Sequence, residues 1–178
     1  MGAAYASIVS QNRRPKVALL SNGREPNKGT EEIVRAHPLL ERCSSIEFIG
    51  NIEGVDIPRG AADVIVCDGF TGNIALKISE GLVETMETLL GEELSSTVTM
   101  RVGSLLTRRA LRRFKRRVDY SEYGGAPLLG VAGVTIVGHG RSSAKAIRNA
   151  MAMAYRFASQ HFIQRVEQTI AAAALQQS

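Results

Sequence analysis

Three short polar loops carry the residues best suited to chemistry. They are SNGREPNKG with Lys28, DGFTGN with Asn73, and GHGRSS with His139. Each combines glycine, which lets the backbone approach a ligand closely, with the expected start of a helix, whose free N–H groups favour an anion. We therefore predict a phosphate-sized site with these three residues as catalytic candidates. The accompanying phosphate-binding candidates are Gly23, Gly29, Asp68, Gly69, Thr71, Gly72, Gly138, Gly140 and Ser142. A purely structural explanation stays open, because tight turns also need glycine.

Several other kinds of site are disfavoured by the motifs that the chain lacks. It has no GxxxxGK[ST] loop, no complete GxGxxG fingerprint, no GxSxG elbow and no HExxH pair. Its three histidines are scattered without metal-ligand spacing. Cys43 and Cys67 show no CxxC spacing, which favours two small core residues in a reducing cytoplasm. We expect neither a cofactor nor a metal.

The elements that must position these loops alternate along the chain. Strands are predicted at 16–20, 46–50, 62–67 and 134–137, each a largely aliphatic run. Helices are predicted over 1–12, from Thr30 with an interruption near His37-Pro38, over 73–90, and from Ser142 or Ser143 to about Ile170. This alternation predicts an α/β fold with a parallel-rich sheet flanked by helices on both faces. In such folds the ligand lies beyond the carboxyl ends of the strands.

One segment gives the chain its basic character. The net charge is +5, and residues 94–118 hold eight basic residues and no acidic one. Two apolar stripes run through this segment on different faces, so we expect a basic amphipathic helical arm with a break near 107–110. The predicted contacts with an anionic membrane or carrier protein are Leu105, Arg108, Arg109, Arg112, Arg113, Phe114 and Arg116. An arm that packs in a dimer is the alternative. Nucleic acid is not expected as a partner, because aromatic residues are not interleaved with the arginines.

Longer motifs resemble a known family. FIGNIEG, ADVIVCDGFTGNIALKISEG, DYSEYGGAPLLG and GHG are similar to sequences of the PlsX-type phosphate acyltransferases of bacterial phospholipid synthesis. That family's chains are about twice this length, so residues 1–178 resemble the C-terminal portion of its domain. The resemblance implies a fold similar to isocitrate/isopropylmalate dehydrogenases or phosphotransacetylases, and a homodimer.

The resemblance also implies a reaction. Inorganic phosphate attacks the thioester of acyl–acyl carrier protein and gives acyl phosphate. Lys28 would hold phosphate, Asn73 would donate its amide to phosphate or the oxyanion, His139 would assist by hydrogen bonding or proton transfer, and Asp68 would orient Lys28 or a loop amide. The expected location is cytoplasmic and peripherally membrane-associated. An acyl-CoA donor, or a non-catalytic fragment that binds membrane or carrier protein, are the alternatives.

Overall fold

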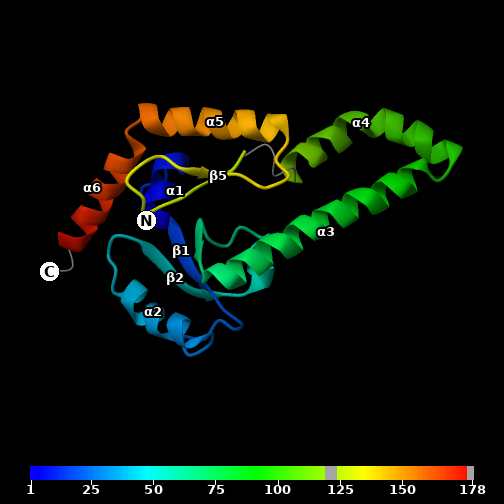
Figure 1. Ribbon diagram of the computed structural model, residues 1–178. Coiled ribbons are helices and arrows are strands. Elements are labelled where there is room, and N and C mark those ends of the chain that lie inside the picture. Colours follow the sequence, from blue (N-terminus) through cyan, green and yellow to red (C-terminus); the bar gives the residue numbers. More distant parts are fainter. Residues whose placement is uncertain (119–123, 176–178) are drawn as a thin grey trace. The chain divides into compact units, whose positions relative to one another are not determined.

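The computed structural model describes residues 1–118 and 124–175, with the helices and strands of Figure 1. The chain divides into two compact units. The first comprises Met1–Asp68, Pro127–Val137 and Ala152–Ser178, and the second comprises Gly69–Ala126 and Gly138–Met151.

A parallel sheet forms the centre of the first unit. Its strands are β1 (Lys16–Leu20), β2 (Glu47–Ile52) and β3 (Val64–Val66), in the order β2-β1-β3. Val17 pairs with Phe48 on one side and with Val64 on the other. Because β1 is the central strand, all its residues after the first are buried. This confirms the predicted α/β character and the parallel pairing of the first three strands.

One helix and one short turn follow the strands of this sheet. α2 (Glu31–Glu41) follows β1, and the 3-10 helix η1 (Gly54–Asp56) follows β2. The predicted interruption at His37-Pro38 is wrong, because α2 continues through Pro38 to Glu41. Buried Ile33 and His37 hold the helix against its unit, and the His37 ring meets Phe48 edge-on at 5.1 Å. The packing of this face offsets the free-energy cost of the backbone hydrogen bond that proline cannot donate.

Aromatic rings join three helices of the first unit. The helices are α1 (Gly2–Ser10), α6 (Phe162–Leu175) and the part of α5 (Ala144–Ser159) that belongs to this unit. Phe157 stacks on Phe162 at 4.4 Å, and Tyr5 meets both rings edge-on. The sequence pattern predicts one helix as far as Ile170, but the chain turns between α5 and α6, where His161 adopts a positive φ of 51°. The turn lets both phenylalanines face the same core.

The fourth predicted strand does not join the parallel sheet. β5 (Ile136–Val137) instead belongs to a separate two-stranded sheet with β4 (Ala126–Pro127). The neighbouring Leu128 N–H donates to the Thr135 carbonyl over 2.9 Å. Val134 and Ile136 pack against the aromatic core. Their aliphatic pattern therefore reflects burial against helices rather than a place in the main sheet.

The second unit contains a helical hairpin. α3 (Gly69–Ser95) and α4 (Val98–Val118) are joined by the turn Ser96-Thr97 and contact each other (Figure 1). Both helices differ from the predictions: α3 begins four residues before Asn73, and α4 has no break near 107–110. None of the 27 described residues of α3 is buried. Its apolar stripe at Ile74, Ile78, Leu82, Met86 and Leu89 is thus exposed.

Candidate functional site

The loop between β1 and α2 holds Lys28 over a glycine. The Lys28 N–H donates to the Glu25 carbonyl over 3.0 Å, which closes a tight turn. A Cβ on Gly23 would lie 2.9 Å from the Lys28 Cγ, so the lysine stem occupies the space that a side chain at position 23 would take. Gly29 has a φ of +106°, where its own Cβ would press on Ile33 and Ser21. Both predicted glycines are thus required by the shape of the loop.

An ion pair ties this loop to η1. Arg24 Nη2 lies 3.0 Å and 3.1 Å from the two carboxylate oxygens of Asp56, whose residue is only 5% exposed. Arg59 approaches the same carboxylate to 3.7 Å, and the Glu53 N–H donates to it. Sequence reasoning missed Asp56, because one aspartate in a polar loop carries no pattern that indicates burial. The pair fixes the loop that carries Lys28.

Two buried polar atoms lie at the same end of the sheet. Asn51 Nδ2 donates to the Glu25 carbonyl over 2.9 Å, which connects β2 to the Lys28 turn. Asn51 Oδ1 and the Ser21 hydroxyl are buried and have no hydrogen-bond partner among the described residues. Burying a polar atom without a hydrogen-bond partner costs free energy. Other contacts of this unit must therefore offset that cost at this end of the sheet.

The second predicted loop is largely helix. Only Cys67 and Asp68 separate β3 from α3, so Gly69, Thr71 and Gly72 lie in the first turns of the helix. Asn73 lies in the second turn rather than at the helix start, so its side chain, not its backbone N–H, is what it can offer a ligand. Burial, and secondly the charge of Asp68, raise the pKa of the Cys67 thiol.

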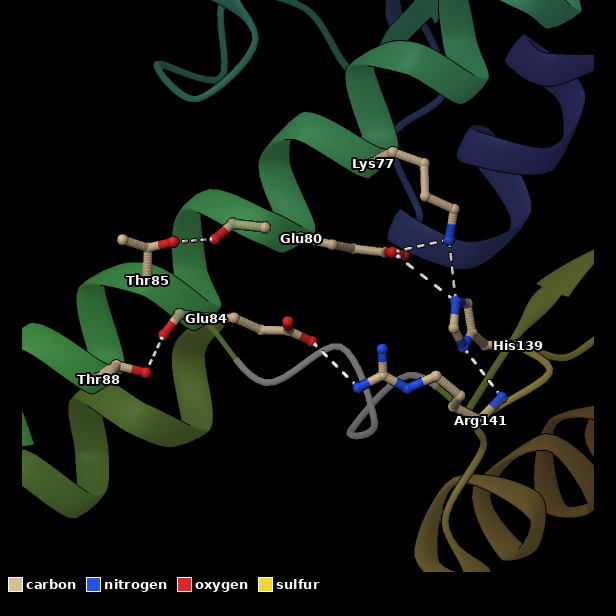
Figure 2. Close-up of polar contacts among 8 residues, drawn as sticks. Lys77, Glu80, Glu84, Thr85, Thr88, His139 and Arg141 are labelled. Carbon is tan, nitrogen blue, oxygen red and sulfur yellow. Dashed lines mark hydrogen bonds and ion pairs between the residues drawn. The ribbon is translucent and has the colours of Figure 1, made fainter.

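The third loop surrounds His139 with backbone groups (Figure 2). The Arg141 N–H donates to His139 Nδ1 over 3.1 Å, and the Ser142 N–H donates to the His139 carbonyl over 2.9 Å. Gly138 and Gly140 flank the histidine in this turn. Ser143, rather than Ser142, caps α5, since its hydroxyl accepts from the Ala146 N–H over 3.2 Å. The loop therefore orients the imidazole of His139.

Side chains from α3 complete the surroundings of His139. Lys77 Nζ lies 2.9 Å from His139 Nε2 and 3.0 Å from Glu80 Oε2, and Glu80 Oε2 lies 3.8 Å from Nε2 (Figure 2). One turn further along α3, Glu84 pairs with Arg141 at 3.8 Å. The pKa of Glu80 is lowered, chiefly because Lys77 donates a hydrogen bond to its carboxylate, although partial burial acts in the opposite direction.

Sequence reasoning missed Lys77 and Glu80, although a signal existed. Asn73, Lys77, Glu80 and Glu84 follow one another at spacings of four, three and four residues, which places them on one face of a helix. That face also receives His139 within the second unit. Two of the three catalytic candidates, Asn73 and His139, therefore belong to one unit, and Lys77 lies between Asn73 and Glu80 along the face of α3. Lys28 and Asp68 belong to the first unit, so a site shared by Lys28 and Asn73 stays a prediction.

The predicted contact residues of the basic arm are mostly exposed. Leu105 is 67% exposed and Phe114 is 47% exposed, and the side chains of Arg108, Arg109, Arg112 and Arg113 also face water. The Arg116 side chain lies outside the part of the structure that is described. Across residues 1–118 and 124–175, no cluster of three or more possible metal ligands occurs.

Comparison with known proteins identifies relatives along nearly the whole chain. The family model described as "Fatty acid synthesis protein" matches residues 1–165. The chain is 51% identical to a phosphate acyltransferase of Acidobacterium capsulatum over 174 residues, which are 98% of this chain and 51% of the relative. It is 45% identical to a phosphate acyltransferase of Geotalea daltonii over 172 residues, which are 94% of this chain and 49% of that relative. The chain thus spans about half the length of the curated relatives it matches. It belongs to the fatty acid synthesis protein family, and the phosphate acyltransferases named above are its relatives.

Proposed function

We propose that this chain forms part of an acyltransferase that moves a fatty acyl group from acyl carrier protein to inorganic phosphate. The observation that carries the proposal is the family match over residues 1–165, together with relatives named phosphate acyltransferase. The loops and the α3 face supply residues suited to that reaction. The product is acyl phosphate for phospholipid synthesis.

The chemistry needs positioning and charge more than a protein nucleophile. An oxygen of hydrogenphosphate forms a bond to the thioester carbonyl carbon, the carbon–sulfur bond breaks, and the proton of hydrogenphosphate ends on the sulfur. Lys28 supplies a charge for phosphate, and the Asn73 amide donates to phosphate or to the oxyanion. His139, oriented by the Arg141 N–H, supplies a hydrogen bond or carries the proton between oxygen and sulfur.

The donor and the fold likeness remain parts of the proposal. Acyl carrier protein is the proposed donor, and acyl-CoA, as in phosphotransacetylases, is the alternative. A three-stranded parallel sheet with covering helices is compatible with the proposed likeness to phosphotransacetylases and isocitrate/isopropylmalate dehydrogenases. A fragment without activity that binds carrier protein or membrane is the second alternative, since the chain spans about half of its relatives.

The helical hairpin is proposed as the surface that contacts an anionic membrane or the acidic carrier protein. In support, α4 presents exposed leucines beside exposed arginines, which is the pattern of a helix that lies at a membrane interface. No helix among the described residues is long and apolar enough to cross a bilayer. The exposed apolar stripe of α3 is available to a second copy of the chain in the proposed homodimer.

The test is phosphate-dependent loss of thioester from acyl–acyl carrier protein, measured beside acyl-CoA. It is run with this chain and with the full-length relative of Acidobacterium capsulatum. We expect Lys28→Ala and Asn73→Ala, placed at the matching positions of the full-length protein, to reduce turnover by about 100-fold or more. Lys16→Ala at the opposite end of β1 is the control, because that exposed side chain lies away from the loops.

Each outcome has a distinct meaning. Near-normal turnover of both the Lys28 and Asn73 variants would remove these residues from the site. Faster turnover of acyl-CoA than of acyl–acyl carrier protein would favour the alternative donor. Full activity of the 178-residue chain alone would show that the rest of the relatives' length is not needed for catalysis.

A further inference from the structure

The contact between Lys77 and His139 has no role in the function proposed above. Lys77 Nζ and His139 Nε2 lie 2.9 Å apart. The Lys77 side chain is 54% exposed and the His139 side chain 29% exposed, so a ligand can reach both. What the contact does depends on which atom carries hydrogen.

A backbone contact indicates the tautomer of His139. Nδ1 accepts a hydrogen bond from the Arg141 N–H over 3.1 Å, so Nδ1 carries a lone pair rather than a hydrogen. A neutral imidazole has one N–H and one acceptor nitrogen, so the hydrogen is on Nε2. His139 Nε2 is therefore a donor, and it points toward Lys77 (Figure 2).

Lys77 is a donor as well, because an ammonium group has three N–H bonds and no acceptor. One of these bonds is directed to Glu80 Oε2 at 3.0 Å. The hydrogen bond from Lys77 lowers the pKa of Glu80, which favours its carboxylate form. Glu80 Oε2 is 3.8 Å from His139 Nε2, which is beyond hydrogen-bond distance. Two donors thus converge beside a single carboxylate.

Converging donors of this kind suit a negatively charged oxygen. We propose that Lys77 and His139 together bind one oxygen of a phosphate-class anion, which makes Lys77 a further anion-binding residue. An oxygen that accepts from both groups would relieve the contact between two donors and would gain a hydrogen bond to a charged group. The inference rests on the proposed function for its setting, in which the anion is the phosphate substrate or the phosphoryl group of the product.

Neighbouring groups support this assignment. Asn73 lies one helical turn before Lys77 on the same face of α3, where residues four apart have Cβ atoms about 5–6 Å apart. Its amide can therefore donate to the same anion. Glu80 opposes the anion by its charge and holds Lys77 when the anion is absent. The Arg141 side chain pairs with Glu84 at 3.8 Å, while its backbone N–H donates to the histidine.

The experiment titrates inorganic phosphate into the 178-residue chain with 15N-labelled histidine, at constant ionic strength set with chloride. Long-range proton–nitrogen spectra report the tautomer of His139, which is assigned with His139→Gln. We expect hydrogen on Nε2 and a shift of the His139 ring signals on phosphate addition. Lys77→Met should weaken phosphate binding by about tenfold or more, as expected when a hydrogen bond from a charged group is lost. Lys77→Arg should restore part of it.

Glu80→Gln gives the opposite sign and separates an anion site from a structural ion pair. It removes the competing carboxylate, so phosphate should bind several-fold more tightly, whereas a structural role for the pair predicts no gain. Lys16→Ala is the matched control for the loss of one positive charge. Hydrogen on Nδ1, an unchanged dissociation constant in Lys77→Met, or weaker binding by Glu80→Gln would each overturn the proposal. Phosphate binding by this chain, beside a full-length relative that transfers no acyl group to phosphate, would contradict the proposed function instead, so the two failures are distinguishable.

Discussion

The β1–α2 loop and the α3–α4 hairpin show two different ways to use polar and apolar residues. The loop is tied down: buried Asp56 holds Arg24, and Asn51 holds the carbonyl of Glu25. In the hairpin, by contrast, no residue of α3 is buried, and α4 exposes leucines beside arginines. Buried contacts raise the free energy of local opening, so we expect the loop to resist local unfolding more than the exposed helices do.

One expected effect concerns the hairpin alone. Leu105→Glu combined with Phe114→Glu should reduce binding to anionic liposomes by more than about tenfold, because it removes apolar contact and adds repulsion on a surface where each basic residue contributes about 1 kcal/mol. Co-sedimentation with anionic and neutral vesicles, at low and high salt, measures this. Leu39→Glu, on an exposed leucine of α2, is the control and should bind normally. Binding that ignores lipid charge would contradict the proposed surface.

Replacing one glycine in the loop and one in the hairpin by alanine should change the free energy of unfolding in opposite directions. Gly29→Ala should lower the free energy of unfolding by about 2–4 kcal/mol, because alanine is strained at a φ of +106° and its Cβ would meet Ile33. Gly103→Ala lies in α4 with no neighbour within 4 Å of the added Cβ, so it should raise stability by about 0.5–1 kcal/mol. Urea unfolding gives both values. Equal effects at the two positions would remove the contrast.

Two arginines offer a matched test of the ion pairs. Arg24→Ala leaves the buried Asp56 carboxylate with weaker partners, so stability should fall by about 1–3 kcal/mol. Arg108→Ala removes the same side chain from an exposed face of α4 and should change stability by less than about 0.5 kcal/mol. Asp56→Asn in the Arg24→Ala background should recover part of the loss. An additive double variant would show that the two residues do not interact.

The smallest effect is expected at Cys67, the residue that follows β3. Burial and the Asp68 charge raise the pKa of Cys67, so less reactive thiolate is present at pH 8 than in an ordinary cysteine. Asp68→Asn removes the smaller of the two causes and should speed alkylation of Cys67 by about twofold. Mass spectrometry after timed iodoacetamide treatment measures this, with Cys43 of the same molecule as the internal reference. A slower reaction in the variant would reverse the assigned sign.

Strands and helices with a regular apolar pattern can be predicted from the sequence, and the elements that differ from prediction do so for identifiable physical reasons. The strand at 16–20 is predicted with its observed bounds because four consecutive aliphatic residues, all buried in the structure, follow Pro15 and Lys16. The aliphatic run at 134–137 looks the same locally, yet β5 belongs to a separate sheet. Likewise Pro38 has no local signal that distinguishes a break from a helix that continues under tertiary packing.

In the candidate site, too, some residues can be predicted from the sequence and others only from the structure. Lys28, Asn73 and His139 were found because glycine and polar residues follow apolar runs in the chain. Lys77 and Glu80 were not, since charged residues on an exposed helix are ordinary until a loop more than fifty residues away brings His139 against them. Asp56 was missed for a similar reason, as its partner Arg24 lies 32 residues earlier.

The amino-acid sequence by itself determined the local properties of this protein: the three glycine-containing loops, the order of strands and helices, the basic charge of residues 94–118, and membership of a family. These depend on residue type and on spacing within a few turns. The tertiary structure determined which strands share a sheet, which helices continue or turn, and which charges meet. Those outcomes depend on burial and on contacts between distant segments, and the free energy of such contacts is not a property of any local stretch of chain.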